Sequence, residues 1–132
     1  MVRGSCLCGS VKFEVAKCST DIFKCHCSRC RKSFGGASSA VTFVQVSDFE
    51  WLSGEGEVAR FALDAGYARH FCKTCGAVVP LHIPSHSLYW VPAGLFDSDP
   101  EVILGRHVHV ASRAPWEVLD GQTEALEEGF DF

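Results

Sequence analysis

The sequence lacks several features that mark whole classes of protein. No apolar run approaches the roughly 20 residues of a membrane-spanning helix. The net charge of -4 on 132 residues is not the basic excess usual in a nucleic-acid binder. No apolar segment of a secretory signal follows Arg3. We therefore expect a cytoplasmic protein with neither nucleic acid nor a membrane as partner. A homo-oligomer is compatible with the sequence, but nothing in it indicates one.

Helical periodicity is weak throughout, and we find no linker, internal repeat or low-complexity segment. Segments rich in β-branched and aromatic residues alternate with glycine-containing breaks, which is typical of short strands joined by turns. The expected strands are residues 11–15, 38–46, 58–63, 77–83, 88–92 and 107–110, with short helical turns at 28–33 and 114–119. The sequence predicts a mainly β fold in one domain over 1–132, with an acidic, solvated tail at 124–132.

Cysteine, by contrast, is abundant, with eight in the chain. In a reducing compartment such cysteines are more plausibly metal ligands or catalytic groups than disulfides. The lone Cys18 fits a small buried hydrophobe. The other seven fall into three short groups, Cys6-x-Cys8, Cys25-x-Cys27-x-x-Cys30 and Cys72-x-x-Cys75.

Counting ligands divides these groups into two sites. Cys72-x-x-Cys75 followed by glycine is typical of a zinc knuckle, which needs two further ligands. The pair Cys6-x-Cys8 supplies them and completes a closed structural site. The remaining group then forms a site of three thiolates with a vacant fourth position, as catalytic zinc sites have. This second site consists of Cys25, Cys27 and Cys30.

Two alternatives stay open at this point. A histidine could close the second site and make both zincs structural, with His70 or His107 as distant candidates. His26 is the weakest candidate, because it lies between two ligands and its side chain would tend to point away from their ion. A thioredoxin-like redox role for Cys72-x-x-Cys75 is disfavoured, because no βαβ pattern surrounds it.

The motifs resemble those of the glutathione-dependent formaldehyde-activating enzyme and centromere protein V family. The match runs in order from about residue 4 to about residue 120. It comprises Gly4-Ser5-Cys6-Leu7-Cys8-Gly9, Cys25-His26-Cys27-Ser28-Arg29-Cys30-Arg31-Lys32, Arg69-His70-Phe71-Cys72-Lys73-Thr74-Cys75-Gly76, Gly94-Leu95-Phe96-Asp97 and Pro115-Trp116. The resemblance implies an Mss4-like fold of short antiparallel strands and hairpins with two zinc ions. It assigns the structural zinc to Cys6, Cys8, Cys72 and Cys75 and the catalytic zinc to Cys25, Cys27 and Cys30.

The resemblance also implies an activity, the addition of the glutathione thiol to formaldehyde, which is classed with the carbon-sulfur lyases. Formaldehyde-activating members tend to be longer and to differ around the middle cysteine motif, so the substrate stays open between small thiols and aldehydes. Three thiolates make zinc a weak activator of water and favour a substrate thiol as fourth ligand. The cationic residues beside the site are candidate contacts for the glutathione carboxylates, or an ordinary solvated face. They are Arg29, Arg31 and Lys32.

Two rival functions remain, a non-catalytic two-zinc binding or interaction module and a glutathione carrier. The odd ligand count favours an enzyme over the module, whereas nothing in the sequence separates an enzyme from a carrier. His107 and His109 would share one strand face and could form a proton shuttle or a site wall, although an ordinary polar strand face is the simpler interpretation. We expect Trp90 and Trp116 to pack in the core or at its edge.

Overall fold

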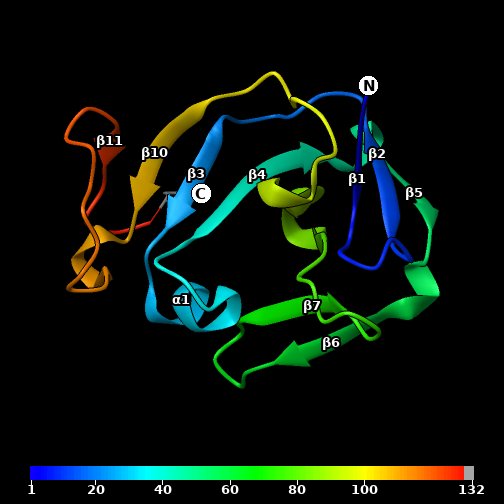
Figure 1. Cartoon of the computed structure of the whole chain (residues 1–132), viewed down its shortest axis with the longest axis horizontal. Coiled ribbons are helices and arrows are strands. Elements are labelled where there is room, and N and C mark those ends of the chain that lie inside the picture. The colour runs from blue at the N-terminus through cyan, green and yellow to red at the C-terminus, as the bar shows by residue number, and fades with distance from the viewer. Residues whose placement is uncertain (130–132) are drawn as a thin grey trace.

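The computed structural model describes residues 1–129 and consists mainly of short strands (Figure 1). The strands are β1 Val2–Ser5, β2 Lys12–Val15, β3 Ile22–Cys25, β4 Ser39–Gln45, β5 Phe49–Ser53, β6 Val58–Ala62, β7 Ala68–Cys72, β8 Leu81–Ile83, β9 Leu88–Pro92, β10 Leu104–Val108 and β11 Glu124–Ala125. The α-helix is α1 Ser28–Phe34, and 3-10 turns lie at Val46–Asp48, Glu55–Glu57, Pro84–His86, Ala93–Leu95 and Val110–Ser112. This confirms the mainly β fold with few short helical turns.

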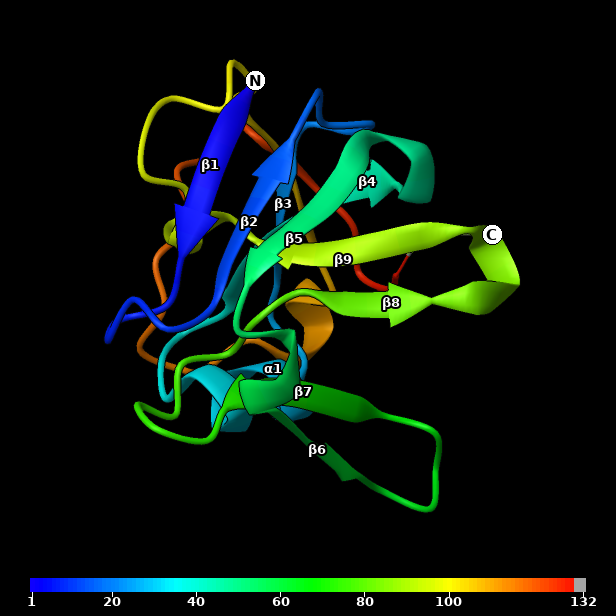
Figure 2. The ribbon, with the colours of Figure 1, turned by 90° about the vertical axis from the view of Figure 1, so that its right-hand side faces the viewer.

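The strands form three sheets (Figures 1 and 2). One has the order β1-β2-β5, the largest has the order β11-β10-β3-β4-β9-β8, and β6 pairs with β7 in a separate hairpin. Most pairs are antiparallel, but β10 runs parallel to β3 and to β11. The parallel pairs join segments that are far apart in the sequence. Helix α1 follows β3 directly and therefore lies at one end of the largest sheet.

The core follows the period-two pattern of the strands. In β2, Phe13 and Val15 are buried while Lys12 is exposed, because alternate side chains point to opposite faces. Phe13 and Val15 pack with Val44 of β4 and Val91 of β9, which joins the smaller sheet to the largest one. A second cluster contains Cys25 and Cys30 together with strand residues of the largest sheet, and a third contains Cys6 and Cys72. Both cysteine groups therefore belong to packed regions of the protein.

Several local expectations differ from the structure. The strand expected at 77–83 begins only at Leu81, directly after Pro80, which lacks the N–H that a ladder needs. His109 has φ 55°, so the chain leaves β10 before it and the two histidines do not share a strand face. The helical turn expected at 114–119 is a single turn closed by the Glu117 N–H on the Ala114 carbonyl at 3.0 Å. Trp116 is 68% exposed and does not pack in the core.

The acidic tail is not simply a solvated end. Its first part forms β11, parallel to β10, and Leu126 donates its N–H to the His107 carbonyl at 2.9 Å. The His109 N–H bonds to the Glu128 carbonyl at 3.0 Å. Backbone groups at a sheet edge need partners whatever the side chains are, and here the tail supplies them. Residues 130–132 of the expected tail lie outside the described residues.

The β6–β7 hairpin lies beside α1 (Figure 1). Tyr67, just before β7, shares a hydrogen bond of 2.8 Å with the Ser33 hydroxyl, and Arg69 donates to the Ser33 carbonyl at 3.1 Å. These bonds hold the hairpin over the helix that carries Cys30. Within the described part of the chain, no helix has the length and apolar character needed to cross a bilayer.

Candidate metal centres

Two tight turns bring four cysteines together. Cys6 and Cys8 lie in the loop between β1 and β2, while Cys72 ends β7 and Cys75 lies in the turn that follows. Their four sulfurs all lie within 4.8 Å of one another. The Cys6–Cys8 sulfurs are 3.7 Å apart and the Cys8–Cys72 sulfurs 3.8 Å apart. Tetrahedral zinc with bonds of about 2.3 Å separates its sulfurs by about 3.8 Å, so this group has the dimensions of a four-thiolate zinc site.

Glycine allows each of these turns to form. Gly9 has φ 81° and donates its N–H to the Cys6 carbonyl at 3.0 Å, and Gly76 has φ 77° and donates to the Cys72 carbonyl at 2.7 Å. A side chain is disfavoured at such positive φ values. The turns aim both cysteines of each pair toward the same point, which is the local reason that these short spacings suit a metal.

Ser10 belongs to the four-cysteine centre, although no sequence pattern pointed to it. Its hydroxyl lies 3.1 Å from the Cys8 sulfur and 3.4 Å from the Cys72 sulfur. The Ser10 hydroxyl, followed by the Cys75 backbone N–H, lowers the pKa of Cys72 to about 6. Hydrogen bonds to a thiolate favour its charged form, which is the form that binds metal. Ser10 therefore supports the thiolates of the four-cysteine centre.

The second centre lies where β3 meets α1. Cys25 is the last residue of β3, Cys27 caps the helix, and Cys30 lies in its first turn, with the three sulfurs within 4.8 Å of one another. The Cys27 sulfur accepts the Cys30 N–H at 3.4 Å. Among residues 1–129, no further cysteine, histidine or carboxylate brings a ligand atom into this group. The three-cysteine centre therefore differs from the first centre in its ligand count.

Negative charge in the three-cysteine centre falls mainly on one sulfur. Hydrogen bonds from Cys25 and then Cys30 lower the pKa of Cys27 to about 2. The hydrogen bond to Cys27 raises the pKa of Cys25 far above its usual value, and burial raises it further. Three like charges at this distance need a cation between them before all can ionise. Both cysteine groups could thus hold a metal ion, and their sulfur donors suit zinc.

The histidines considered as closing ligands are engaged elsewhere. His26 is fully buried, and its Nε2 lies 2.9 Å from Nδ1 of His107, so the ring points away from the neighbouring sulfurs, as expected. Burial and then the His107 charge lower the pKa of His26. Nε2 of His70 lies 3.1 Å from the Arg60 guanidinium. None of the three belongs to the three-cysteine centre.

A large cavity opens beside Cys30. Its volume is about 520 Å³, and besides Cys30 it is lined by Arg60, Gly66, Tyr67, Ala68, Leu81, His82, Ile83, Pro84 and Trp90. Tyr67 is half-buried, and burial is the main cause that raises the pKa of its phenol. The hydrogen bond with Ser33 lowers this pKa, whereas the Cys30 and Cys27 sulfurs raise it. The Tyr67 hydroxyl therefore stays protonated at neutral pH beside the three-cysteine centre. No sequence pattern pointed to Tyr67, which the β6–β7 hairpin brings to the site.

Tyr67 also lines a smaller hollow. Its volume is about 260 Å³, and it is lined by Arg29, Lys32, Ser33, Phe61, Leu63, Tyr67 and Arg69. Two of the three predicted carboxylate contacts, Arg29 and Lys32, thus face a common space. Arg31 does not line it, and Arg69, which we did not predict, takes part instead. The hollow has three cationic side chains and no acidic one, so its cations could bind an anionic group, although the exposed Phe61 and Leu63 make much of its surface apolar.

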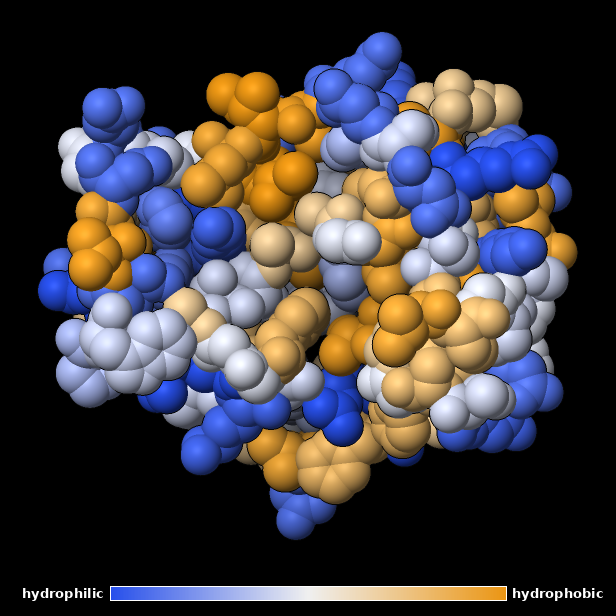
Figure 3. All heavy atoms as spheres, viewed as in Figure 1, coloured by the Kyte–Doolittle hydropathy of each residue, from blue (hydrophilic) through white to orange (hydrophobic). Residues whose placement is uncertain are grey.

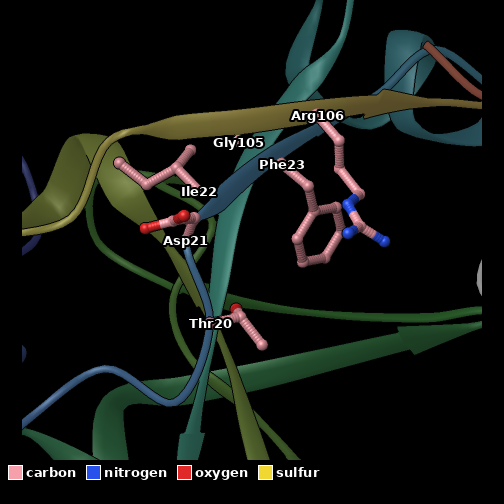
Figure 4. A pocket seen from close by; sticks show the side chains of 6 residues that line it. All are labelled: Thr20, Asp21, Ile22, Phe23, Gly105 and Arg106. Carbon is pink, nitrogen blue, oxygen red and sulfur yellow. The ribbon is translucent and has the colours of Figure 1, made fainter. Parts of the chain in front are cut away.

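The remaining surface and the cavity at the start of β3 lie apart from the cysteine centres. Figure 3 shows apolar residues spread over the middle of the face seen in Figure 1, with hydrophilic residues toward its margins. A cavity of about 380 Å³ at the start of β3, formed with β10, contains Asp21 and Arg106 but no cysteine (Figure 4). Cys25 lies at the opposite end of the same strand. This cavity is therefore separate from both cysteine centres.

Comparison with known proteins identifies a family for the chain. The family model described as "Glutathione-dependent formaldehyde-activating enzyme" matches residues 1–112. A Halomonas elongata protein, provisionally named a glutathione-dependent formaldehyde-activating enzyme, is 27% identical over 135 residues, covering 94% of this chain and 84% of that protein. A crystal structure of a Rhodobacter sphaeroides protein matches with a TM-score of 0.62 and 20% identity, covering 94% of this chain and 98% of that one. This last likeness concerns the fold alone.

Proposed function

The chain belongs to the glutathione-dependent formaldehyde-activating enzyme family, and we propose that it is a zinc-dependent carbon-sulfur lyase. It adds a glutathione-like thiol to a small aldehyde such as formaldehyde. The observation that carries the proposal is the unequal pair of cysteine centres. Four sulfurs close one centre, while the other has three sulfurs, no fourth ligand among the described residues and a cavity beside it.

We assign one zinc ion to each centre. An ion held by Cys6, Cys8, Cys72 and Cys75 would be structural, because four thiolates would leave it no open position for a substrate. When bound by Cys25, Cys27 and Cys30, zinc supplies a soft Lewis acid that favours a thiolate over water in its remaining position. The residues around the second centre then position the reactants.

The cationic hollow is the proposed site for the carboxylates of the thiol substrate. Arg29, Lys32 and Arg69 all line it, and the hydrogen bond from Arg69 to the Ser33 carbonyl fixes this arginine against α1. Tyr67 lines both this hollow and the cavity that contains Cys30, so an anion bound there would share this residue with the three-cysteine centre. Holding the thiol beside the three-cysteine centre converts its encounter with the aldehyde into a reaction between positioned groups.

Tyr67 is the proposed hydrogen-bond donor to the carbonyl oxygen. The thiolate sulfur attacks the carbonyl carbon, the carbonyl electron pair moves onto oxygen, and a proton completes the hydroxyl of the adduct. The phenol carries its proton at neutral pH, as tyrosine does at its ordinary pKa of 10, and can stabilise the negative charge that develops on oxygen. The reverse reaction cleaves the carbon–sulfur bond, as the lyase class requires.

The partners of the proposed enzyme are small molecules, a thiol and an aldehyde. We place the activity in the cytoplasm, because eight cysteines with two thiolate centres need reducing conditions.

Metal analysis and exchange kinetics test the proposal. Protein purified without chelators should contain about two zinc ions per chain, by the ligand counts above. NMR exchange spectroscopy should show thiol–aldehyde exchange faster than the spontaneous rate. Tyr67→Phe should slow the exchange by about 100-fold, whereas Tyr89→Phe, a control that lines neither hollow, should have little effect.

Three outcomes would count against it. Fewer than two zinc ions per chain would contradict the two-centre scheme. Full zinc loading without acceleration for any thiol and aldehyde would favour the non-catalytic binding module. Glutathione binding without acceleration would favour the carrier.

A further inference from the structure

The cavity beside Cys30 is far larger than formaldehyde requires. Its volume is about 520 Å³. Formaldehyde has two heavy atoms and needs a space comparable to that of one or two water molecules, each of which takes about 30 Å³ in the liquid. Most of the cavity would therefore remain unused if formaldehyde were the carbonyl substrate.

The wall of this cavity is mainly apolar. Leu81 and Trp90 face each other across the β8–β9 pair, and Ile83 and Pro84 continue the same surface. Ile83, Trp90 and Tyr67 also pack against the core cluster that contains Cys25 and Cys30, so the wall is fixed to the three-cysteine centre. A wall of this composition gains most by excluding water from an alkyl or aryl group.

Two polar residues of the wall, Arg60 and His82, interact with neighbouring side chains. Arg60 and His82 are both exposed. The Arg60 guanidinium lies 3.1 Å from His70 Nε2, and the His82 ring stacks on Tyr89 with centroids 5.1 Å apart. Both side chains still line the cavity, so its apolar surface lies beside two exposed polar groups that already have partners.

Tyr67 lines both the cavity beside Cys30 and the cationic hollow. The hollow contains Arg29, Lys32 and Arg69 beside Phe61 and Leu63, and the cavity contains Cys30 and the apolar wall beside Arg60 and His82. We therefore assign the carboxylates of the thiol to the three cations and the carbonyl compound to the apolar wall beside Cys30.

We propose that the carbonyl substrate is an aldehyde with an apolar substituent, such as a branched alkyl group, which occupies the cavity beside Cys30. The inference rests on the proposed function. The thiol adds across the carbonyl group, so that sulfur bonds to carbon and the thiol proton ends on the new hydroxyl. No atom is lost and no oxidant or reductant is needed.

A series of aldehydes tests the inference. With glutathione as thiol, the zinc-loaded protein should exchange 3-methylbutanal with a kcat/KM at least tenfold above those of formaldehyde and glyoxylate, each corrected for its spontaneous rate. Acceleration of formaldehyde alone, or equal acceleration of all three aldehydes, would overturn the inference and leave the proposed function standing.

A binding measurement separates the inference from the proposed function. The unreactive alcohol 3-methylbutan-1-ol should shift the methyl NMR signals of Leu81 and Ile83 in a saturable way. If no aldehyde is accelerated, the proposed function fails, and this titration still decides what the cavity accepts. Unshifted methyl signals at millimolar alcohol would overturn the inference.

A cavity-filling variant tests the inference, and a variant at the paired strand position is its matched control. Ala68 lines the cavity, whereas its strand partner Ala62 is exposed and lines neither hollow. Ala68→Leu should lower the ratio of kcat/KM for 3-methylbutanal over formaldehyde at least tenfold, and Ala62→Leu should change it less than twofold. Zinc content confirms that both variants fold. An unchanged ratio in Ala68→Leu, or equal effects of the two variants, would overturn the inference.

Discussion

Replacing Cys75 by serine perturbs a centre that ties distant parts of the chain together. Cys8 and Cys72 are 64 positions apart, yet their sulfurs lie 3.8 Å apart. In the chain-entropy treatment of a cross-link, closing a loop of this length stabilises the fold by about 4 kcal/mol. Typical unfolding free energies are about 5–15 kcal/mol, so this is a large part of the total. We expect Cys75→Ser to lower the unfolding free energy by about 4 kcal/mol.

The matched control is Cys27→Ser in the other centre. Its three cysteines lie within six residues, so a metal there closes only short loops, worth about 2 kcal/mol or less by the same treatment. Serine is also a favoured helix cap, and its hydroxyl can replace the sulfur that accepts the Cys30 N–H. The variant should lose zinc and activity with much smaller damage to stability.

Urea unfolding followed by circular dichroism, with metal content measured in parallel, compares the two variants. Each should retain about one zinc ion per chain. The midpoint should fall strongly for Cys75→Ser and weakly for Cys27→Ser at an unchanged slope. Equal destabilisation would refute the reasoning and favour two structural centres. Wild-type stability of Cys75→Ser would show that no metal cross-links these turns.

Three further predictions concern the framework. Gly4→Ala should destabilise by about 1–3 kcal/mol in urea unfolding, because the new Cβ would lie 2.2 Å from the fully buried Phe13 ring; wild-type stability would show that the ring can move. His107→Ala should cost about 1–3 kcal/mol, because it leaves the buried His26 Nε2 without its partner; a loss below 0.5 kcal/mol, roughly the effect of a neutral surface change, would contradict that role. By NMR, the Asp120 carboxyl should titrate with a pKa of about 2, because the hydroxyl and then the backbone N–H of the threonine three residues later bond to it. Since this pKa is depressed in the folded protein, the stabilising contribution is complete above the ordinary pKa of 3.8 and is lost as pH falls toward 2; titration near 3.8 would show that the hydrogen bonds are absent in solution.

The parts of the fold that the sequence predicted depend on local patterns. Period-two alternation identified the strand containing Phe13, because the buried and exposed faces of a strand alternate residue by residue. The predicted strand boundaries were wrong where a single residue changed the backbone conformation or removed a hydrogen-bond donor. Pro80 delays β8 to Leu81, and the positive φ of His109 takes the chain out of β10.

The grouping of the cysteines was also visible in the sequence. Pairs such as Cys72 and Cys75 stand at the spacing that one tight turn brings to a common point. Spacing alone could not assign the distant pair Cys6 and Cys8 to the same centre. That assignment came from the number of ligands that a closed zinc site needs. The structure brings these four sulfurs together and leaves the other three apart from them.

The surroundings of the three-cysteine centre depend on contacts between residues that are distant in sequence. His26 meets His107 across 81 positions, and Tyr67 reaches Ser33 across 34. No short-range pattern encodes such contacts, because they depend on how whole strands and hairpins pack. Local spacing therefore identified the sulfurs that can hold a metal, whereas tertiary packing created the apolar cavity and the cationic hollow that Tyr67 lines.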